Sequence, residues 1–439
     1  MRWVRHAVVM VIALTWFATL GAMAAQPNTG QSVDVLRSWY MLVLELVRHT
    51  PTYSPPVASR SYGYLGVTAF EAVAAGSRDL RSLAGQLNGL QAVPKRASGT
   101  TYDDAVVLQA AIAFAVKDLF SNTGPTGQRA MAAVEAKLRA RVSASVPADV
   151  VTSSEAYGRA VAAHVLDWSR SDSGAIIENM GFPLEYQLTK GPAHWVPTSL
   201  IAQQQNPLLP NWGKNRTFVM PDGAACALPA PPDYSEEKTS EFYQQALEVY
   251  ETTQKLTAEQ RTIARFWSDD AMLSTTPPGH WISIALQILE RGDAGPGRSV
   301  EVLARLGVAM SDAFVGCWNS KYQYDLLRPV TYIRRVMDPK WEHLLITPPF
   351  PEYPSGHSTQ SAAAAAVLTD LFGENFAFQD STLERDGLAA RGFPSFSAAA
   401  NEAGISRLYG GIHFRAAIER GLEQGRCIGG YVNALRTRR

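Results

Sequence analysis

The sequence predicts an all-α protein built from helical bundles. Two observations predict this class: apolar residues recur at helical spacing in several long segments, and the apolar-polar alternation typical of strands is scarce. A third observation concerns residues 171–232, where Pro, Gly, Asn and Trp are scattered without a sustained period. This texture predicts a loop-rich connection between two helical halves, each like a four-helix bundle. We therefore divide the chain into a helical region with its loop-rich connection at 26–232 and a second helical region at 233–439.

The helices of the first region follow from local signals. Residues 32–50 place Leu36, Val43 and Leu46 on one helical face, and Pro51 ends that helix. Residues 101–104 (TYDD) form a capping signal before an apolar helix that reaches Phe120. A further helix is expected over residues 154–169.

The second region begins after residues 227–232 (ALPAPP), which we interpret as a linker. Asp233 and Ser235 are then expected to cap a new helix. Thr257 and Gln260 have the spacing of a capping box, which predicts a short helix through Trp267. A long helix should run from residue 299 to about 324.

The N-terminus has the pattern of a cleavable signal peptide over residues 1–25. Arg2 and Arg5 precede an apolar run at 7–20, and small residues follow at 22, 24 and 25. This predicts export to the periplasm or the extracellular space. The run is short for a membrane anchor, and no later segment is long and apolar enough to span a bilayer. Basic and acidic residues are balanced at 40 each, which excludes bulk attraction to nucleic acid.

The chain contains three cysteines, Cys226, Cys317 and Cys427. An odd count allows at most one disulfide and leaves one free thiol. The spacing is not that of a disulfide framework or a zinc site.

Three short motifs in the second region carry the candidate chemistry. They read K-x6-R-P (residues 321–329), P-S-G-H (354–357) and S-R-x5-H (406–413). Together they supply three cations, a glycine-containing turn and two histidines. This is the donor set that a tetrahedral oxyanion requires.

The P-S-G-H motif precedes an alanine-rich segment and should open a helix. Ser355 can cap that helix, and Gly356 lets the backbone come close to a ligand. The first N–H groups of a helix are unpaired and carry the positive end of its dipole, so they suit an anion, with His357 beside it. Taken alone, the motif is equally compatible with an ordinary helix start.

The cations of the other motifs have their own alternatives. Lys321 and Arg328 are seven residues apart, which places them two turns apart on nearly the same helical face. Surface cations are the alternative, although the apolar neighbours Trp318 and Leu326 favour burial. Arg407 can bind two oxygens in a fork. A neutral His413 can attack or ligate a central atom, the alternative being a histidine bonded within the core.

In this order the three motifs resemble the superfamily of vanadium-dependent haloperoxidases and type-2 phosphatidic acid phosphatases, over roughly residues 266–414. The resemblance implies that the oxygens of vanadate or phosphate are held by Lys321, Arg328, Ser355, Gly356 and Arg407. It further implies that His413 bonds vanadium or attacks phosphorus, and that His357 is the general acid–base.

Two further matches favour the haloperoxidase branch. Trp318 and Phe350 fall where fungal-type chloroperoxidases place aromatic side chains near the halide. Residues 266–270 (FWSDD) are similar to the stretch whose acidic residue pairs with the second anion-binding arginine, which suggests Asp270 against Arg407. For His280, further along, we expect a structural role.

One position departs from the family pattern. The family usually has an aspartate four residues after the final histidine, and this chain has Ala417 there. His413 must then be oriented by a backbone carbonyl, by Glu419 or by a residue elsewhere. A phosphatase, which needs a strongly nucleophilic histidine, should suffer more from this loss than an enzyme that only ligates vanadium.

The leading hypothesis is therefore an exported vanadate-dependent haloperoxidase that oxidises halide with hydrogen peroxide. The alternative is a soluble phosphatase that cleaves phosphate esters with a histidine nucleophile in the same pocket. A third class is a non-catalytic helical protein that retains a phosphate pocket. The loop-rich middle is compatible with a role in a homodimer contact.

Overall fold

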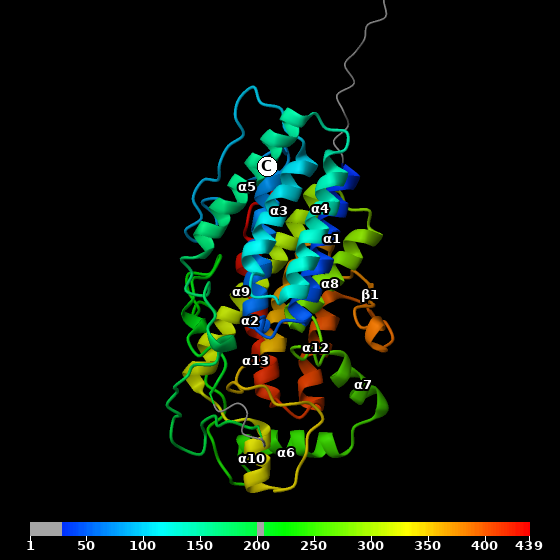
Figure 1. Cartoon of the computed structure of the whole chain (residues 1–439). Coiled ribbons are helices and arrows are strands. Elements are labelled where there is room, and N and C mark those ends of the chain that lie inside the picture. Colours follow the sequence, from blue (N-terminus) through cyan, green and yellow to red (C-terminus); the bar gives the residue numbers. More distant parts are fainter. Residues whose placement is uncertain (1–28, 200–205) are drawn as a thin grey trace, which may run out of the picture.

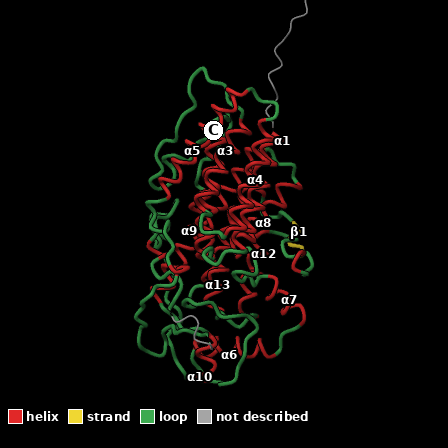
Figure 2. The backbone as a smooth tube through the Cα atoms, viewed as in Figure 1, coloured by secondary structure: helices red, strands yellow, loops and turns green. Residues whose placement is uncertain are grey.

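The computed structural model describes residues 29–199 and 206–439, and their regular structure is almost entirely helical (Figures 1 and 2). The α-helices are α1 (Thr29–Arg48), α2 (Pro55–Ala74), α3 (Asp104–Leu119), α4 (Pro125–Ser143), α5 (Ala148–Ser169), α6 (Glu241–Gln254), α7 (Ala258–Phe266), α8 (Thr276–Arg291), α9 (Pro296–Tyr324), α10 (Pro329–Val336), α11 (Gly356–Phe372), α12 (Phe396–Tyr409) and α13 (Arg415–Asn433). One antiparallel hairpin pairs β1 (Phe378–Asp380) with β2 (Arg391–Phe393). The predicted all-α class is confirmed.

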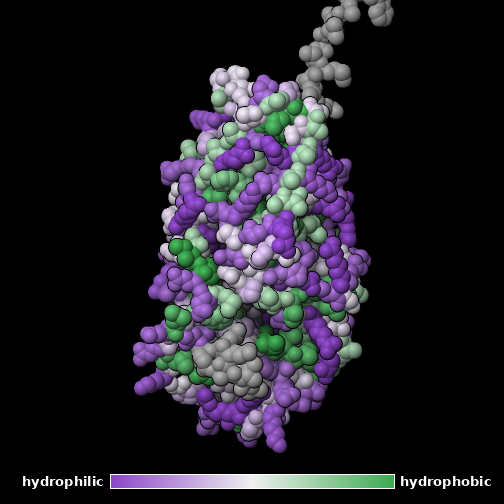
Figure 3. Space-filling view, viewed as in Figure 1, coloured by the Kyte–Doolittle hydropathy of each residue, from purple (hydrophilic) through white to green (hydrophobic). Residues whose placement is uncertain are grey.

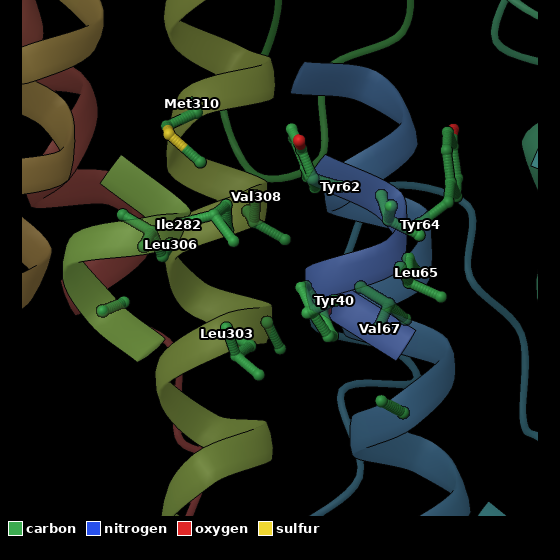
Figure 4. Close-up of a cluster of buried hydrophobic side chains, with 14 of the residues drawn as sticks. Tyr40, Tyr62, Tyr64, Leu65, Val67, Ile282, Leu303, Leu306, Val308 and Met310 are labelled. Atoms are coloured by element: carbon green, nitrogen blue, oxygen red, sulfur yellow. The ribbon is translucent and has the colours of Figure 1, made fainter. Parts of the chain in front are cut away.

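Helices α2 and α9 lie side by side at the centre of the molecule and carry much of its core (Figure 4). Their axes approach closely because small residues meet at the crossing. A Cβ at Gly66 would lie 2.8 Å from Cα of Ala304, and one at Gly307 would lie 2.6 Å from the carbonyl oxygen of Tyr62. Around this contact, apolar side chains of α1, α2, α8 and α9 interdigitate. The N-terminal and C-terminal helices thus share one core, and the division at residues 232/233 stays a prediction.

Several helix boundaries agree with the local signals. Asp103 caps α3 by accepting the N–H groups of Ala105 and Val106 at 2.9 and 3.0 Å. Thr257 and Gln260 form the predicted capping box of α7. The segments predicted from residues 32, 154 and 299 correspond to α1, α5 and α9.

The predicted cap at Asp233 or Ser235 is wrong. Helix α6 begins at Glu241, and Ser240 is its cap. The Tyr332 hydroxyl donates to the carbonyl of Ser235, and the Tyr234 ring packs against Phe242 and Tyr332. These tertiary contacts hold the segment outside a helix, so the helix starts only after them.

The predicted loop-rich connection contains only two short 3₁₀ turns within its described residues, at Asn179–Gly181 and Trp212–Lys214. Buried charges attach it to the helices. Asp172 accepts hydrogen bonds of 2.7 Å from both Arg60 and Tyr64 of α2. A disulfide joins Cys226, at the end of the connection, to Cys427 of α13, and Cys317 is a buried free thiol.

Asp312 of α9 provides a second attachment and a test of it. Its buried carboxylate accepts the N–H groups of Phe218, Val219 and Met220 at 2.6, 2.9 and 3.2 Å. Replacing Asp312 by alanine leaves these donors unpaired, and we expect the free energy of unfolding to fall by about 2–3 kcal/mol in urea titrations. Asp118, an exposed partner of Arg170, is the matched control. A loss at Asp312 no larger than at Asp118 would contradict this account.

None of the helices within the described residues is both long and apolar enough to cross a membrane. The face shown in Figure 3 is largely hydrophilic, with scattered apolar patches. The predicted signal peptide lies outside the described residues.

Candidate active site

A cavity of about 390 Å³ lies where the start of α11 and the end of α12 meet several loops, and the turn before α2 and the loop-rich connection also contribute to its lining. Seven of the predicted site residues line it: Asp270, Trp318, Phe350, Gly356, His357, Arg407 and His413. Lys321, Arg328 and Ser355 are fully buried next to these residues, outside the lining itself. The three sequence motifs therefore come together in space.

Lys321 and Arg328 do not share a helical face, which corrects the prediction. Helix α9 ends at Tyr324 because Asp325 adopts a left-handed conformation (φ 48°, ψ 40°). Leu326 then pairs with His194 of the loop-rich connection, and Arg328 becomes the residue before α10. The two cations reach the site from different elements.

Within the described residues, all the hydrogen bonds of the Lys321 ammonium go to backbone carbonyls. Its Nζ donates to the carbonyl oxygens of Pro351 at 2.9 Å and Glu352 at 3.0 Å, and to that of Pro354. Burial lowers the pKa of Lys321 to about 7. Lys321 thus stabilises the loop that leads into α11, and it lies buried beside the cavity.

Arg328 is held in place but keeps one free donor. Its Nε donates to the carbonyl of Phe350 and its Nη1 to that of Ile412, both at 2.9 Å. Nη1 also lies 3.2 Å from Nε2 of His413. The Nη2 atom is buried and has no hydrogen-bond partner among the described residues. Unpaired buried donors are costly, so this atom points to a missing acceptor such as an anion oxygen.

The start of α11 is as predicted. Ser355 caps the helix by accepting the N–H of Ser358 at 3.3 Å, and Gly356 is the first helical residue. The unpaired N–H groups of this first turn lie beside the cavity, which Gly356 and His357 line.

His413 is oriented by Glu352, a residue that the sequence analysis missed. Nδ1 of His413 lies 2.8 Å from Oε1 of Glu352, which also accepts the N–H of Phe414 at 2.9 Å. Burial and the nearby cations Arg328 and Lys321 hold the pKa of His413 well below its usual range. The ring is therefore neutral, with its Nδ1–H on the carboxylate and its Nε2 lone pair facing Nη1 of Arg328.

Glu352 takes the place of the carboxylate that the family usually has at the position of Ala417. It is fully buried, and burial raises its pKa to about 7 against the pull of Arg328 and Lys321. Glu419, one of the alternatives, is instead exposed and lies 3.8 Å from Arg415. The only available signal was that Glu352 is the sole carboxylate in the ten residues before Ser355.

His357 and Arg407 both line the cavity and contact each other; we call these two residues, His413 and the first turn of α11 the cavity floor. Nε2 of His357 lies 3.3 Å from Nη1 of Arg407 and 3.7 Å from Oδ2 of Asp269. Burial and the charge of Arg407 lower the pKa of His357 to about 4, so the imidazole is neutral at ordinary pH. Arg407 also donates to its own neighbour Ser406 at 3.1 Å.

The ion pair predicted between Asp270 and Arg407 is not formed within 4.0 Å in the part of the chain that the structure describes. Asp269 has a left-handed backbone (φ 48°), and both acidic residues line the cavity, but only Asp269 approaches a site histidine, with its Oδ2 3.7 Å from Nε2 of His357. Asp270 interacts with Arg407 only through its charge, and burial raises the pKa of Asp270. Asp269 is the carboxylate that supports the site.

Most of the other residues that line the cavity are apolar. They include Phe182, Leu208, Phe314, Trp318, Pro349 and Phe350. The rings of Trp318 and Phe350 lie 4.9 Å apart, and the Arg328 guanidinium lies 5.0 Å from the Phe350 ring. The site thus combines a cationic floor with an aromatic wall.

The protein is thus all-α, with three buried cations and a helix N-terminus at one cavity, and comparison with known proteins specifies its class. A family model for the second helical-bundle domain of VCPO matches residues 301–438. The structure of the first bacterial vanadium-dependent iodoperoxidase is similar over 92% of this chain and 97% of that one, with 38% identity and a TM-score of 0.84. The chain belongs to the vanadium-dependent haloperoxidases, and it is an enzyme of that type.

A bacterial vanadium-dependent chloroperoxidase in its holo form is also similar, over 93% of this chain and 95% of that one. At 16% identity and a TM-score of 0.67, this likeness concerns the fold alone. Comparison with curated proteins gives no match.

Proposed function

We propose that the cavity holds vanadate and that the enzyme uses it to oxidise halide with hydrogen peroxide. The observation that carries the proposal is the convergence of a neutral histidine, an arginine with an unpaired buried Nη2 and a helix N-terminus on one cavity floor. These groups fit a tetrahedral oxyanion whose central atom accepts a nitrogen ligand. Bound vanadate supplies the Lewis-acid centre that activates peroxide toward the halide.

In this proposal each residue has a defined task. Nε2 of His413 would ligate vanadium, and Glu352 orients the ring for this by accepting the Nδ1–H. Arg328, Arg407 and the first N–H groups of α11 bind the oxygens. Lys321 adds positive charge from below and fixes the loop at residues 351–354.

His357 is the proposed general acid–base. It lines the cavity, is neutral, and can take a proton from hydrogen peroxide as the peroxide binds. Asp269 and Arg407 on either side of Nε2 orient the ring.

Arg407 provides a direct test of the anion site. Replacing Arg407 by alanine removes a charged donor worth about 1.5–3 kcal/mol, so vanadate should bind about 10- to 100-fold more weakly in calorimetry. Replacing Arg420, an exposed arginine paired with Glu423 on α13, should leave the affinity unchanged. Equal affinities in wild type and the Arg407 variant would place the anion elsewhere.

We further propose that iodide is the preferred halide. The aromatic and proline wall offers a halide little compensation for its lost water, and the largest halide is the least strongly hydrated. The relative with 38% identity is an iodoperoxidase. We expect kcat/KM to fall in the order iodide, bromide, chloride in peroxide-dependent assays of the vanadate-loaded enzyme. A higher kcat/KM for bromide or chloride would refute this order.

Phosphate ester hydrolysis is the second candidate function, and Glu352 favours it. The expectation that a missing carboxylate disfavours a histidine nucleophile no longer applies, since Glu352 supports His413. The two functions separate in one experiment: iodide-dependent halogenation of a phenol dye with vanadate and peroxide, beside hydrolysis of p-nitrophenyl phosphate without vanadate. Hydrolysis without any halogenation would reverse the order of the two proposals.

Export remains a proposal that rests on residues 1–25. The basic pair, the apolar run and the small residues after it support a cleavable signal peptide. N-terminal sequencing of the protein recovered from the producing cells would locate the cleavage.

A further inference from the structure

Three charged side chains, Asp269, His280 and Asp380, contact one another in series, beginning next to His357. Nδ1 of His280 lies 2.9 Å from Oδ1 of Asp269, and its Nε2 lies 2.7 Å from Oδ2 of Asp380. The side chains of His280 and Asp380 have no exposed surface, and that of Asp269 is 2% exposed. An imidazole can satisfy a carboxylate on each nitrogen only by donating from both, so His280 is an imidazolium.

Three separate elements build this line. Asp269 lies in the loop after α7, His280 in the first turns of α8, and Asp380 at the end of β1. The Trp267 ring stacks on His280 at 4.6 Å, which fixes the plane of the imidazole. Asp380 is itself fixed because its Oδ1 accepts the N–H of Thr382 at 2.9 Å. The hairpin is thereby connected to Asp269 through His280.

The charge of His280 decides the state of Asp269. Burial opposes the charge on His280, but Asp269 and Asp380 together raise its pKa to about 10. Burial likewise opposes ionisation of Asp269, yet His280 holds the pKa of Asp269 well below its usual range. Without this cation, two carboxylates would share a dry region and one of them would take up a proton.

Asp269 presents its second oxygen to His357. This Oδ2 atom is buried, has no hydrogen-bond partner among the described residues, and lies 3.7 Å from Nε2 of His357. The charged groups that face His357 are Arg407 from α12, Asp269 from its loop and His280 from α8. Of these, only Asp269 favours the protonated form of His357.

We propose that His280 is a positioning residue: it keeps Asp269 ionised and directed at His357, and so supports proton transfer by His357 without touching substrate. This inference rests on the proposed acid–base role of His357. A neutral or misdirected Asp269 would leave the imidazolium of His357 beside Arg407 without a counter-charge, so the proton transfer would slow.

The test compares His280→Gln with His164→Gln, a matched substitution at a half-buried histidine bonded to the carbonyl of Gln91. Loss of a residue that orients a catalytic group lowers activity by about 10- to 100-fold, so kcat of His280→Gln should fall by that factor. The KM for halide and the vanadate affinity should stay close to wild type, because the anion-binding groups are intact. His164→Gln should match wild type throughout.

Two more variants separate positioning from simple structural support. His280→Lys retains a cation between the carboxylates and should recover part of the kcat lost in His280→Gln. Asp380→Asn weakens the hold on His280 and should also lower kcat, which keeps the proposal testable if the His280 variants do not fold. In NMR spectra of protein labelled at histidine, an imidazolium that is hydrogen-bonded at both nitrogens gives far-downfield N–H signals. These signals should be present in wild type and changed in Asp380→Asn.

Unchanged kcat per folded molecule in His280→Gln and Asp380→Asn would overturn the proposal. So would a lysine variant no better than glutamine, or a loss of vanadate affinity as large as the loss of kcat. His357→Ala identifies which inference fails. If it keeps full turnover, the proposed role of His357 is refuted, whereas if it loses turnover and His280→Gln does not, only the positioning role is.

Discussion

Replacing His357 by alanine is expected to lower kcat for halide oxidation by about 10²- to 10⁴-fold, the usual contribution of a positioned acid–base group. The reason is geometric. His357 is the neutral imidazole on the cavity floor, whereas His413 is committed to Glu352 through its Nδ1. His343 is half-buried, is bonded to Thr347 and does not line the cavity.

Steady-state kinetics on vanadate-loaded protein would measure this effect. His357 is not a ligand in the proposed site, so vanadate affinity should fall far less than kcat, and the loss should appear mainly in kcat. His343→Ala is the control for loss of a half-buried imidazole outside the cavity. A His357 variant that keeps wild-type kcat would show that another group, or solvent, moves the proton.

Local signals in the sequence were sufficient for the parts of the fold that depend on neighbouring residues. The caps at Asp103, Thr257 and Ser355 each need only residues two or three positions away, and all three are present. The cap expected at Asp233 or Ser235 failed for the opposite reason. There the Tyr332 hydroxyl, about a hundred residues further on, takes the backbone carbonyl of Ser235.

The candidate site likewise has features that short motifs predict and features that depend on the folded backbone. The motifs predicted which residues gather at one cavity, because each motif is a short string. They did not predict how Lys321 and Arg328 arrive there, since a single left-handed residue, Asp325, ends the helix between them. The choice between Asp269 and Asp270 also depends on a left-handed backbone, which residue types alone do not reveal.

The role of Glu352 could not be predicted from the spacing of residues in the sequence. It lies 61 residues before His413, and only the folded chain brings the two side chains together. A search for the orienting carboxylate near the final histidine fails because this protein takes it from the loop before α11. That same loop is fastened by Lys321, so the cation and the carboxylate form one unit beneath the cavity.

Replacing Glu352 by alanine is therefore expected to weaken vanadate binding by about 10- to 100-fold and to lower turnover at low vanadate, because a hydrogen-bond partner that orients a metal-ligating histidine contributes about that factor. His413 loses the acceptor that fixes its tautomer and its ring plane. Lys321 and Arg328 keep their positive charges without Glu352, which favours an anion and limits the loss. Vanadate titrations followed by calorimetry and by peroxidase activity would measure both effects.

Glu352→Gln separates the two parts of that loss. Its amide oxygen can still accept the Nδ1–H of His413, but it carries no charge to balance Lys321 and Arg328. Because orientation of His413 carries the expected loss, the glutamine variant should bind vanadate at least nearly as well as wild type, whereas the alanine variant should not. A glutamine variant as weak as alanine would contradict this account. Glu419→Ala, at the exposed carboxylate on α13, is the control and should have no effect. Wild-type affinity in Glu352→Ala would mean that His413 needs no carboxylate, and that the vanadium ligand is held by packing alone.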